Sequence, residues 1–115
     1  MKKVRIDIIK IKSNIYEISY KEFVALREKW SRHQYIDHCL YICKIYGSYL
    51  CMDNSIDNCL IKELSTRDRA ICWLLRCDYN AEELENMQDI EVRHLLAKED
   101  YVIHSIDGIE EHIGI

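Results

Sequence analysis

Cysteine and histidine are the residues with the most obvious chemistry in this 115-residue chain, and the first arrangement to consider is a tetrahedral Zn²⁺ site. His38, Cys39 and Cys43 are close in sequence, but no Cys-x-x-Cys pair occurs. In a strand, Cys39 and Cys43 are about 13 Å apart, too far to bind one ion. Cys51 and Cys59 face each other across an expected hairpin but supply only two ligands. We expect reduced cysteines and no cofactor, and leave open whether Cys51 and Cys59 bind a metal.

A catalytic centre would need a nucleophile with a nearby base, or an acid–base pair. A thiol could act with His33, His38 or His94, but the sequence has no nucleophile-elbow glycines, no Gly-rich phosphate loop and no His-Glu-x-x-His motif. Ser19 and Ser65, the candidate hydroxyl nucleophiles, are already explained as helix caps. The sequence therefore predicts a protein that is not an enzyme.

A basic segment near the N-terminus gives the best argument for nucleic-acid binding. Lys10 and Lys12 share one face of an extended segment with Lys2. His33 and His38 could add the proton transfer of a metal-independent nuclease. The formal net charge of -4 opposes phosphate binding, which dominates such affinity. A small nucleic-acid-directed protein, either a transcriptional accessory factor or a nuclease, is therefore the alternative hypothesis.

Charge is distributed unevenly along the chain. Residues 1–77 contain 14 Lys and Arg against 9 Asp and Glu, whereas residues 78–115 contain 2 against 11, so the formal charges are +5 and -9. An acidic surface of this strength can enter a basic groove on a partner, because complementary potentials raise the encounter rate and fix orientation. The acids that we expect to meet a basic, normally nucleic-acid-occupied surface are Glu82, Glu83, Glu85, Asp89 and Glu91.

The first third of the chain predicts one strand and one helix. Apolar and charged residues alternate over 4–8, which indicates a strand, and Ser13-Asn14 favours a turn after it. Ser19 and Glu22 have the spacing of a capping box, so we expect a helix to begin there.

The rest of the chain predicts three strands, then helices and a last strand. Turn-forming residues separate the β-rich runs, so these runs predict a three-stranded antiparallel meander over 39–45, 49–53 and 59–64. Helices are expected over 66–77, after a capping box of Asn80 and Glu83, and from Asp89. A last strand is expected over 101–104. The order predicts a single α+β domain over 1–115, with helices packed on one face of a mainly antiparallel sheet formed by the first strand and the meander.

Trp73 is expected to be a core anchor of the helix over 66–77. It belongs to the apolar stripe of that helix, and we expect it to pack on the strands around Leu60 and Met52. The other role open to it is that of an exposed hot spot for a partner.

The segments 49–64 and 69–74 together carry a recognisable pattern. An Asp-Asn turn, here Asp53-Asn54, joins two strands, and an Ala-x-x-Trp-Leu helix follows. Over about 26 residues this resembles small, uncharacterised proteins of phages and mobile elements in low-GC bacteria. Asp57 stands where the pattern usually has the turn glycine, so the loop is strained unless Asp57 adopts left-handed backbone geometry. The resemblance implies a phage or prophage accessory role.

These features predict a non-enzymatic phage or mobile-element protein that binds and inhibits a host protein or nucleoprotein complex through an acidic surface. An anti-CRISPR or similar anti-defence factor is the most concrete version. No segment approaches the ~20 apolar residues that cross a membrane, and the start of the chain lacks the apolar core of a signal peptide, so we expect a cytoplasmic protein of the bacterial host cell. We do not expect direct nucleic-acid binding, and we leave open a homodimer.

Overall fold

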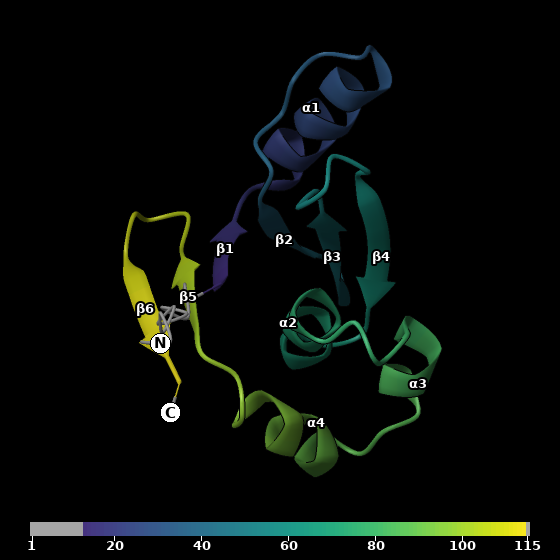
Figure 1. Cartoon of the computed structure of the whole chain (residues 1–115), viewed down its shortest axis with the longest axis vertical. Coiled ribbons are helices and arrows are strands. Elements are labelled where there is room, and N and C mark those ends of the chain that lie inside the picture. Colours follow the sequence, from purple (N-terminus) through teal and green to yellow (C-terminus); the bar gives the residue numbers. More distant parts are fainter. Residues whose placement is uncertain (1–12, 115) are drawn as a thin grey trace, which may run out of the picture.

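The computed structural model describes residues 13–114, which form a mixed six-stranded sheet with four helices (Figure 1). The strands are β1 Ser13–Glu17, β2 Leu40–Ile45, β3 Ser48–Asp53, β4 Leu60–Leu64, β5 Tyr101–His104 and β6 Glu110–Ile113. The helices are α1 Tyr20–Ser31, α2 Arg67–Leu75, α3 Ala81–Glu85 and α4 Asp89–Leu96. The α+β class is confirmed. Within this range no helix combines the length and the apolar character needed to span a membrane.

The strands are arranged in the order β4-β3-β2-β1-β5-β6. β1 is parallel to both of its neighbours, β2 and β5, whereas the other pairs are antiparallel. The expectation of a mainly antiparallel sheet made of the first strand and a three-stranded meander is therefore wrong. The reason is the two helical connections, α1 between β1 and β2 and α2–α4 between β4 and β5, because each returns the chain to the end of the sheet at which its first strand began.

β1 lies in the middle of the sheet and begins where the sequence favoured a turn. The strand predicted over 4–8 lies outside the described residues. The turn predicted at Ser13-Asn14 is wrong, because these two residues are paired with β5. Pairing on both sides of β1 outweighs the weak preference of Ser and Asn for turns. Ile15 is fully buried on one face of the sheet.

Helices cover both faces of the sheet, so the expectation of helices on one face is also wrong. On the face covered by α2, the core includes Ile42 and Cys51. On the face covered by α1, a smaller cluster includes Tyr41, Cys43 and Phe23. Successive residues of a strand point to opposite faces, so β2 is buried on both sides. A strand of this kind reads as a continuous apolar run, as 40–43 does.

Two predicted capping boxes are confirmed. The Ser19 hydroxyl accepts a hydrogen bond from the Glu22 amide at 3.1 Å, and the carboxylate of Glu22 reaches back to the Ser19 amide. At α3, the Asn80 side chain accepts from the Glu83 amide at 2.8 Å and Glu83 accepts from the Asn80 amide at 3.2 Å. Short-range motifs thus fix the starts of α1 and α3.

Candidate functional site

The predicted acidic residues lie together on two consecutive short helices. α3 and α4 are at one end of the molecule, and α1 is at the opposite end of its longest axis (Figure 1). All five side chains are exposed, namely Glu82, Glu83, Glu85, Asp89 and Glu91. We call these five residues the acidic surface.

Two members of the acidic surface also hold the backbone. Glu83 accepts a hydrogen bond from the Asn80 amide and so completes the capping box of α3. Glu85 accepts a hydrogen bond from the Ser65 amide at 2.7 Å, which ties α3 to the turn before α2. Ser65, which the sequence suggested as the cap of α2, is not the cap, because Thr66 performs that role. The carboxylates of Glu83 and Glu85 are therefore held in place before any partner arrives.

A buried arginine that no sequence pattern predicted connects the helices at this end. The Arg69 side chain is 8% exposed and donates to the carbonyl oxygens of Leu84, at 2.9 Å, and Met87. It also donates to Thr66 and forms an ion pair with Asp89 at 2.8 Å. Arg69 thereby binds the backbone between α3 and α4 to α2. Arginine among apolar helical residues usually marks an exposed position, so patterning could not identify this role.

Most of the negative charge of the acidic surface is uncompensated. Of the five acids of the acidic surface, only Asp89 pairs with a cation among residues 13–114. Glu83 and Glu85 accept hydrogen bonds from backbone amides, which leaves their charge in place. The side chains of Glu82 and Glu91 are exposed and form no hydrogen bond or ion pair with any residue that the structure describes. This end of the molecule therefore presents a negative potential to a partner.

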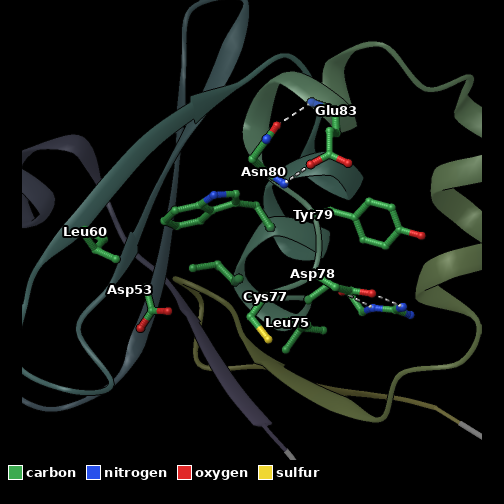
Figure 2. A pocket seen from close by; sticks show the side chains of 11 residues that line it. Asp53, Leu60, Leu75, Cys77, Asp78, Tyr79, Asn80 and Glu83 are labelled. Atoms are coloured by element: carbon green, nitrogen blue, oxygen red, sulfur yellow. Dashed lines mark hydrogen bonds and ion pairs between the residues drawn. The ribbon is translucent and has the colours of Figure 1, made fainter.

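A hollow of about 500 Å³ adjoins the acidic surface (Figure 2). It lies between the C-terminal end of α2, the start of α3, and the paired ends of β3 and β4. Its walls are apolar at Leu60, Trp73, Leu74 and Leu75, and acidic at Asp53, Asp78 and Glu83. We call it the α2 hollow.

Trp73 lies partly in the core and partly in the α2 hollow. It is half-buried and packs against the core on the α2 face of the sheet. Leu60 lies with it in the hollow, but Met52 belongs to the cluster on the opposite face. Trp73 therefore packs on the face formed by the strands that contain Leu60 and Met52, as predicted, but not on the Met52 side chain, because Met52 precedes Asp53 by one position and points to the other side of β3.

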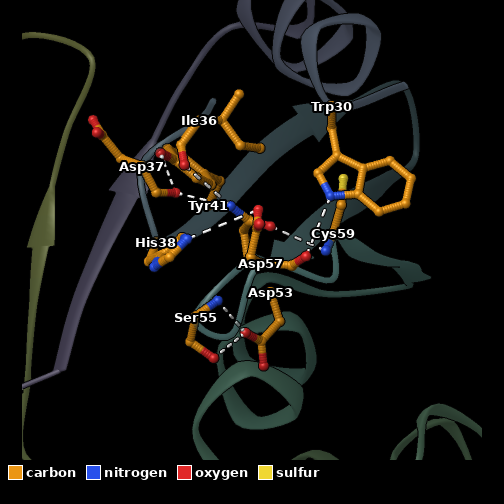
Figure 3. Close-up of polar contacts among 10 residues, drawn as sticks. Trp30, Ile36, Asp37, His38, Tyr41, Asp53, Ser55, Asp57 and Cys59 are labelled. Atoms are coloured by element: carbon orange, nitrogen blue, oxygen red, sulfur yellow. Dashed lines mark hydrogen bonds and ion pairs between the residues drawn. The ribbon is translucent and has the colours of Figure 1, made fainter. Parts of the chain in front are cut away.

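The two candidate histidines lie near two loops that Asn54 joins, and Figure 3 shows His38 beside Asp57 there. Asn54 is fully buried. Its side-chain nitrogen donates a hydrogen bond to the Asp37 carbonyl at 3.0 Å, and its side-chain oxygen accepts one from the backbone amide of Cys59 at 3.0 Å. Asp57 has φ +59°, so the left-handed geometry that the sequence required of it is confirmed. His33 is also left-handed, with φ +58°.

The structure places both histidines beside Asp57. His38 Nε2 lies 3.8 Å from a carboxylate oxygen of Asp57, and both side chains are largely exposed. His33 lines an open hollow of about 400 Å³ with Asp57, Trp30, Gln34 and Tyr35, and no lysine or arginine is among the lining residues. Lys10 and Lys12, the other residues of the nucleic-acid hypothesis, lie outside the described residues.

The cysteines are separated rather than clustered. Cys51 is paired with Lys62 across β3 and β4 and lies in the core of the α2 face, whereas Cys59 packs against the cluster on the α1 face. The expectation that Cys51 and Cys59 face each other is wrong, since the register puts Met52, not Cys51, on the side of Cys59. Within residues 13–114, no three His, Cys, Asp or Glu side chains are grouped to hold a metal. Burial raises the pKa of Cys51 to about 12 and that of Cys72 to about 11.

Comparison of the chain with protein families, with curated proteins and with solved structures finds no significant match.

Proposed function

We propose that this chain is a non-catalytic protein-binding module of a phage or mobile element that inhibits a host protein or nucleoprotein complex. The observation that carries the proposal is the group of uncompensated carboxylates on α3 and α4. The partner surface is basic and normally holds nucleic acid, so the acidic surface competes with phosphates for the same cations. An anti-CRISPR or other anti-defence factor is the most concrete version.

The way in which the carboxylates are held supports binding. Glu83 and Glu85 are fixed by backbone amides, so they lose little side-chain entropy when a partner binds. Glu82 and Glu91 are free to adjust to the partner. Their charges steer the encounter and set its orientation, an effect that weakens as salt rises.

The state of the buried thiols supports a role other than catalysis. A cysteine nucleophile acts as the thiolate. Because burial raises the pKa of Cys51 and Cys72 far above neutrality, both thiols stay protonated in the folded protein at pH 7.

Affinity capture from a bacterial host lysate tests the proposal, with the full chain as bait at low and high salt. We expect host proteins to be retained at low salt and released at high salt. The double variant Glu82→Lys/Glu91→Lys should lose them, because it reverses two charges without removing an internal contact. The control is Glu28→Lys/Asp107→Lys, which changes the net charge equally at two exposed positions outside the acidic surface. The proposal is contradicted if the wild-type chain retains no host protein, or if the control variant loses the retained proteins to the same extent as Glu82→Lys/Glu91→Lys.

A further inference from the structure

The α2 hollow combines exposed apolar surface with room for a side chain. Its volume of about 500 Å³ lies within the range of ~300–1,000 Å³ that ligand pockets have. Leu60 is 50% exposed, although it is apolar, and Trp73 is partly exposed. A long side chain with an aliphatic stem would cover this surface.

Charge in the α2 hollow favours a cation. Arg76, the one cationic residue in its lining, pairs with Asp78 at 2.9 Å and with Glu99 at 3.4 Å, so these carboxylates already balance it. Asp53 and Glu83 have no cationic partner within the described chain. The hollow thus carries two uncompensated carboxylates.

Both of these carboxylates are positioned and keep a free acceptor. One oxygen of Asp53 accepts from the amide of Ser55 at 2.9 Å and from its hydroxyl at 2.6 Å (Figure 3). One oxygen of Glu83 accepts from the Asn80 amide. In each case the second oxygen accepts no hydrogen bond from a residue of the described range. Figure 2 shows Leu60 beside Asp53 on one side of the hollow, and Asn80 with Glu83 on another.

The end of α2 adds to this negative potential. The last turn of α2 contains no basic residue, and the cation at its C-cap, Arg76, is already balanced by Asp78 and Glu99. The C-terminal residues of the helix, Leu74 and Leu75, line the hollow.

We propose that the α2 hollow is an anchor pocket for an arginine side chain of a protein partner. The aliphatic stem of the arginine covers Leu60, the guanidinium lies against the Trp73 ring, and the uncompensated carboxylates of Asp53 and Glu83, on different sides of the hollow, attract its charge. A guanidinium fits better than an ammonium because it is planar, stacks on aromatic rings and has five donors. The inference rests on the proposed function, since it names the residue by which a basic partner is held beside the acidic surface.

Titration of the full chain with N-acetyl-arginine N-methylamide tests the pocket directly. The readout is the NMR signal of the Trp73 indole N–H, which the variant Trp30→Phe distinguishes from that of Trp30, the second tryptophan. We expect a saturable shift with a dissociation constant on the order of 1 mM. The matched citrulline compound has nearly the same shape without the charge and should bind at least about fivefold more weakly.

Conservative variants separate the charge from the fold. Asp53→Asn/Glu83→Gln keeps the shapes, and Gln can replace Glu in a capping box, so the variant should remain folded with an unchanged thermal midpoint. We expect it to bind the arginine compound at least about fivefold more weakly, while the control Glu63→Gln/Asp107→Asn binds as the wild type does. No shift of the Trp73 signal, or equal shifts with the citrulline compound, overturns the inference.

The two proposals fail in different ways. If host proteins are captured through Glu82 and Glu91 but the arginine compound does not shift the Trp73 signal, only the arginine pocket is wrong. If the compound binds as expected and no host protein is captured, the pocket assignment stands and the proposed function is wrong.

Discussion

Two buried polar side chains, in two different regions of the molecule, perform the same task by different chemistry. Arg69 holds the backbone between α3 and α4 to α2, and Asn54 holds the loop after α1 to the turn after β3. The arginine brings a charge that an exposed carboxylate, Asp89, balances, whereas the amide is neutral. Both side chains bind backbone groups, but at the end with the acidic surface the donor is a charged guanidinium, whereas at the other loops it is a neutral amide. Salt and pH should therefore act mainly on the acidic end.

Replacement of the buried arginine should have the largest effect on stability. We expect Arg69→Met to lower the free energy of unfolding by about 2–4 kcal/mol, because the carbonyl oxygens of Leu84 and Met87 each lose the hydrogen bond from Arg69. Urea unfolding followed by circular dichroism measures it. The control Arg93→Met, at an exposed position of α4, should stay within ~0.5 kcal/mol of the wild type.

The partner of Arg69 sharpens this prediction. Asp89 is 76% exposed, so Asp89→Asn should cost less than ~1 kcal/mol, and the cost should shrink at high salt. An equal loss in both variants would mean that the ion pair, rather than the carbonyl contacts, holds α3 and α4.

Replacement of Asn54 should have the second-largest effect on the free energy of unfolding. Asn54→Ala leaves the Cys59 amide and the Asp37 carbonyl without this partner, and we expect a loss of about 2 kcal/mol that does not depend on salt. Hydrogen exchange of the Cys59 amide should become fast. A salt-dependent loss, or an unchanged exchange rate, would contradict the contrast between the two regions.

Trp73 should have a smaller effect than a core tryptophan. Full truncation of a buried aromatic residue costs ~3–5 kcal/mol, and because Trp73 is only half-buried we expect Trp73→Ala to cost about 1–2 kcal/mol. Thermal unfolding checks this value. An unchanged thermal midpoint would mean that Trp73 serves only in binding. A decrease of more than ~3 kcal/mol in the free energy of unfolding would mean that it is a core residue.

The smallest effect should appear in the pH dependence of the acidic end. The Arg76 guanidinium, hydrogen-bonded to Asp78, lowers the pKa of that carboxyl below its usual value of 3.8. A carboxyl with a lowered folded-state pKa adds stability above its unfolded pKa and loses it as pH falls through the folded value. Asp78→Asn should therefore lower the melting midpoint at about pH 7 but not at about pH 2. A difference that persists in acid would contradict the role of the ion pair.

Local features of this fold could be predicted from the sequence, and long-range features could not. The capping boxes at Ser19 and Asn80 depend on residues three apart, and the left-handed Asp57 depends on its own turn. The position of β1 between β2 and β5 depends on a partner about ninety residues away, as in the pair of Ser13 with Tyr101. No short-range pattern carries that information.

The candidate site divides in the same way. The sequence placed Glu82, Glu83 and Glu85 on one short helix, and the structure has them there. It could not predict that Arg69 is buried beneath them, or that Trp73 opens into a hollow, because both depend on how α2 meets α3 and β4.

The central position of β1 determines what the protein can do while it is still being made. On the ribosome β1 emerges early, but its second neighbour, β5, begins only at Tyr101. Until then one edge of β1 has no strand to pair with, and such an edge can pair with another nascent chain. A premature stop before Tyr101 therefore leaves a sheet in which β1 is an edge strand, unpaired on the side of β5.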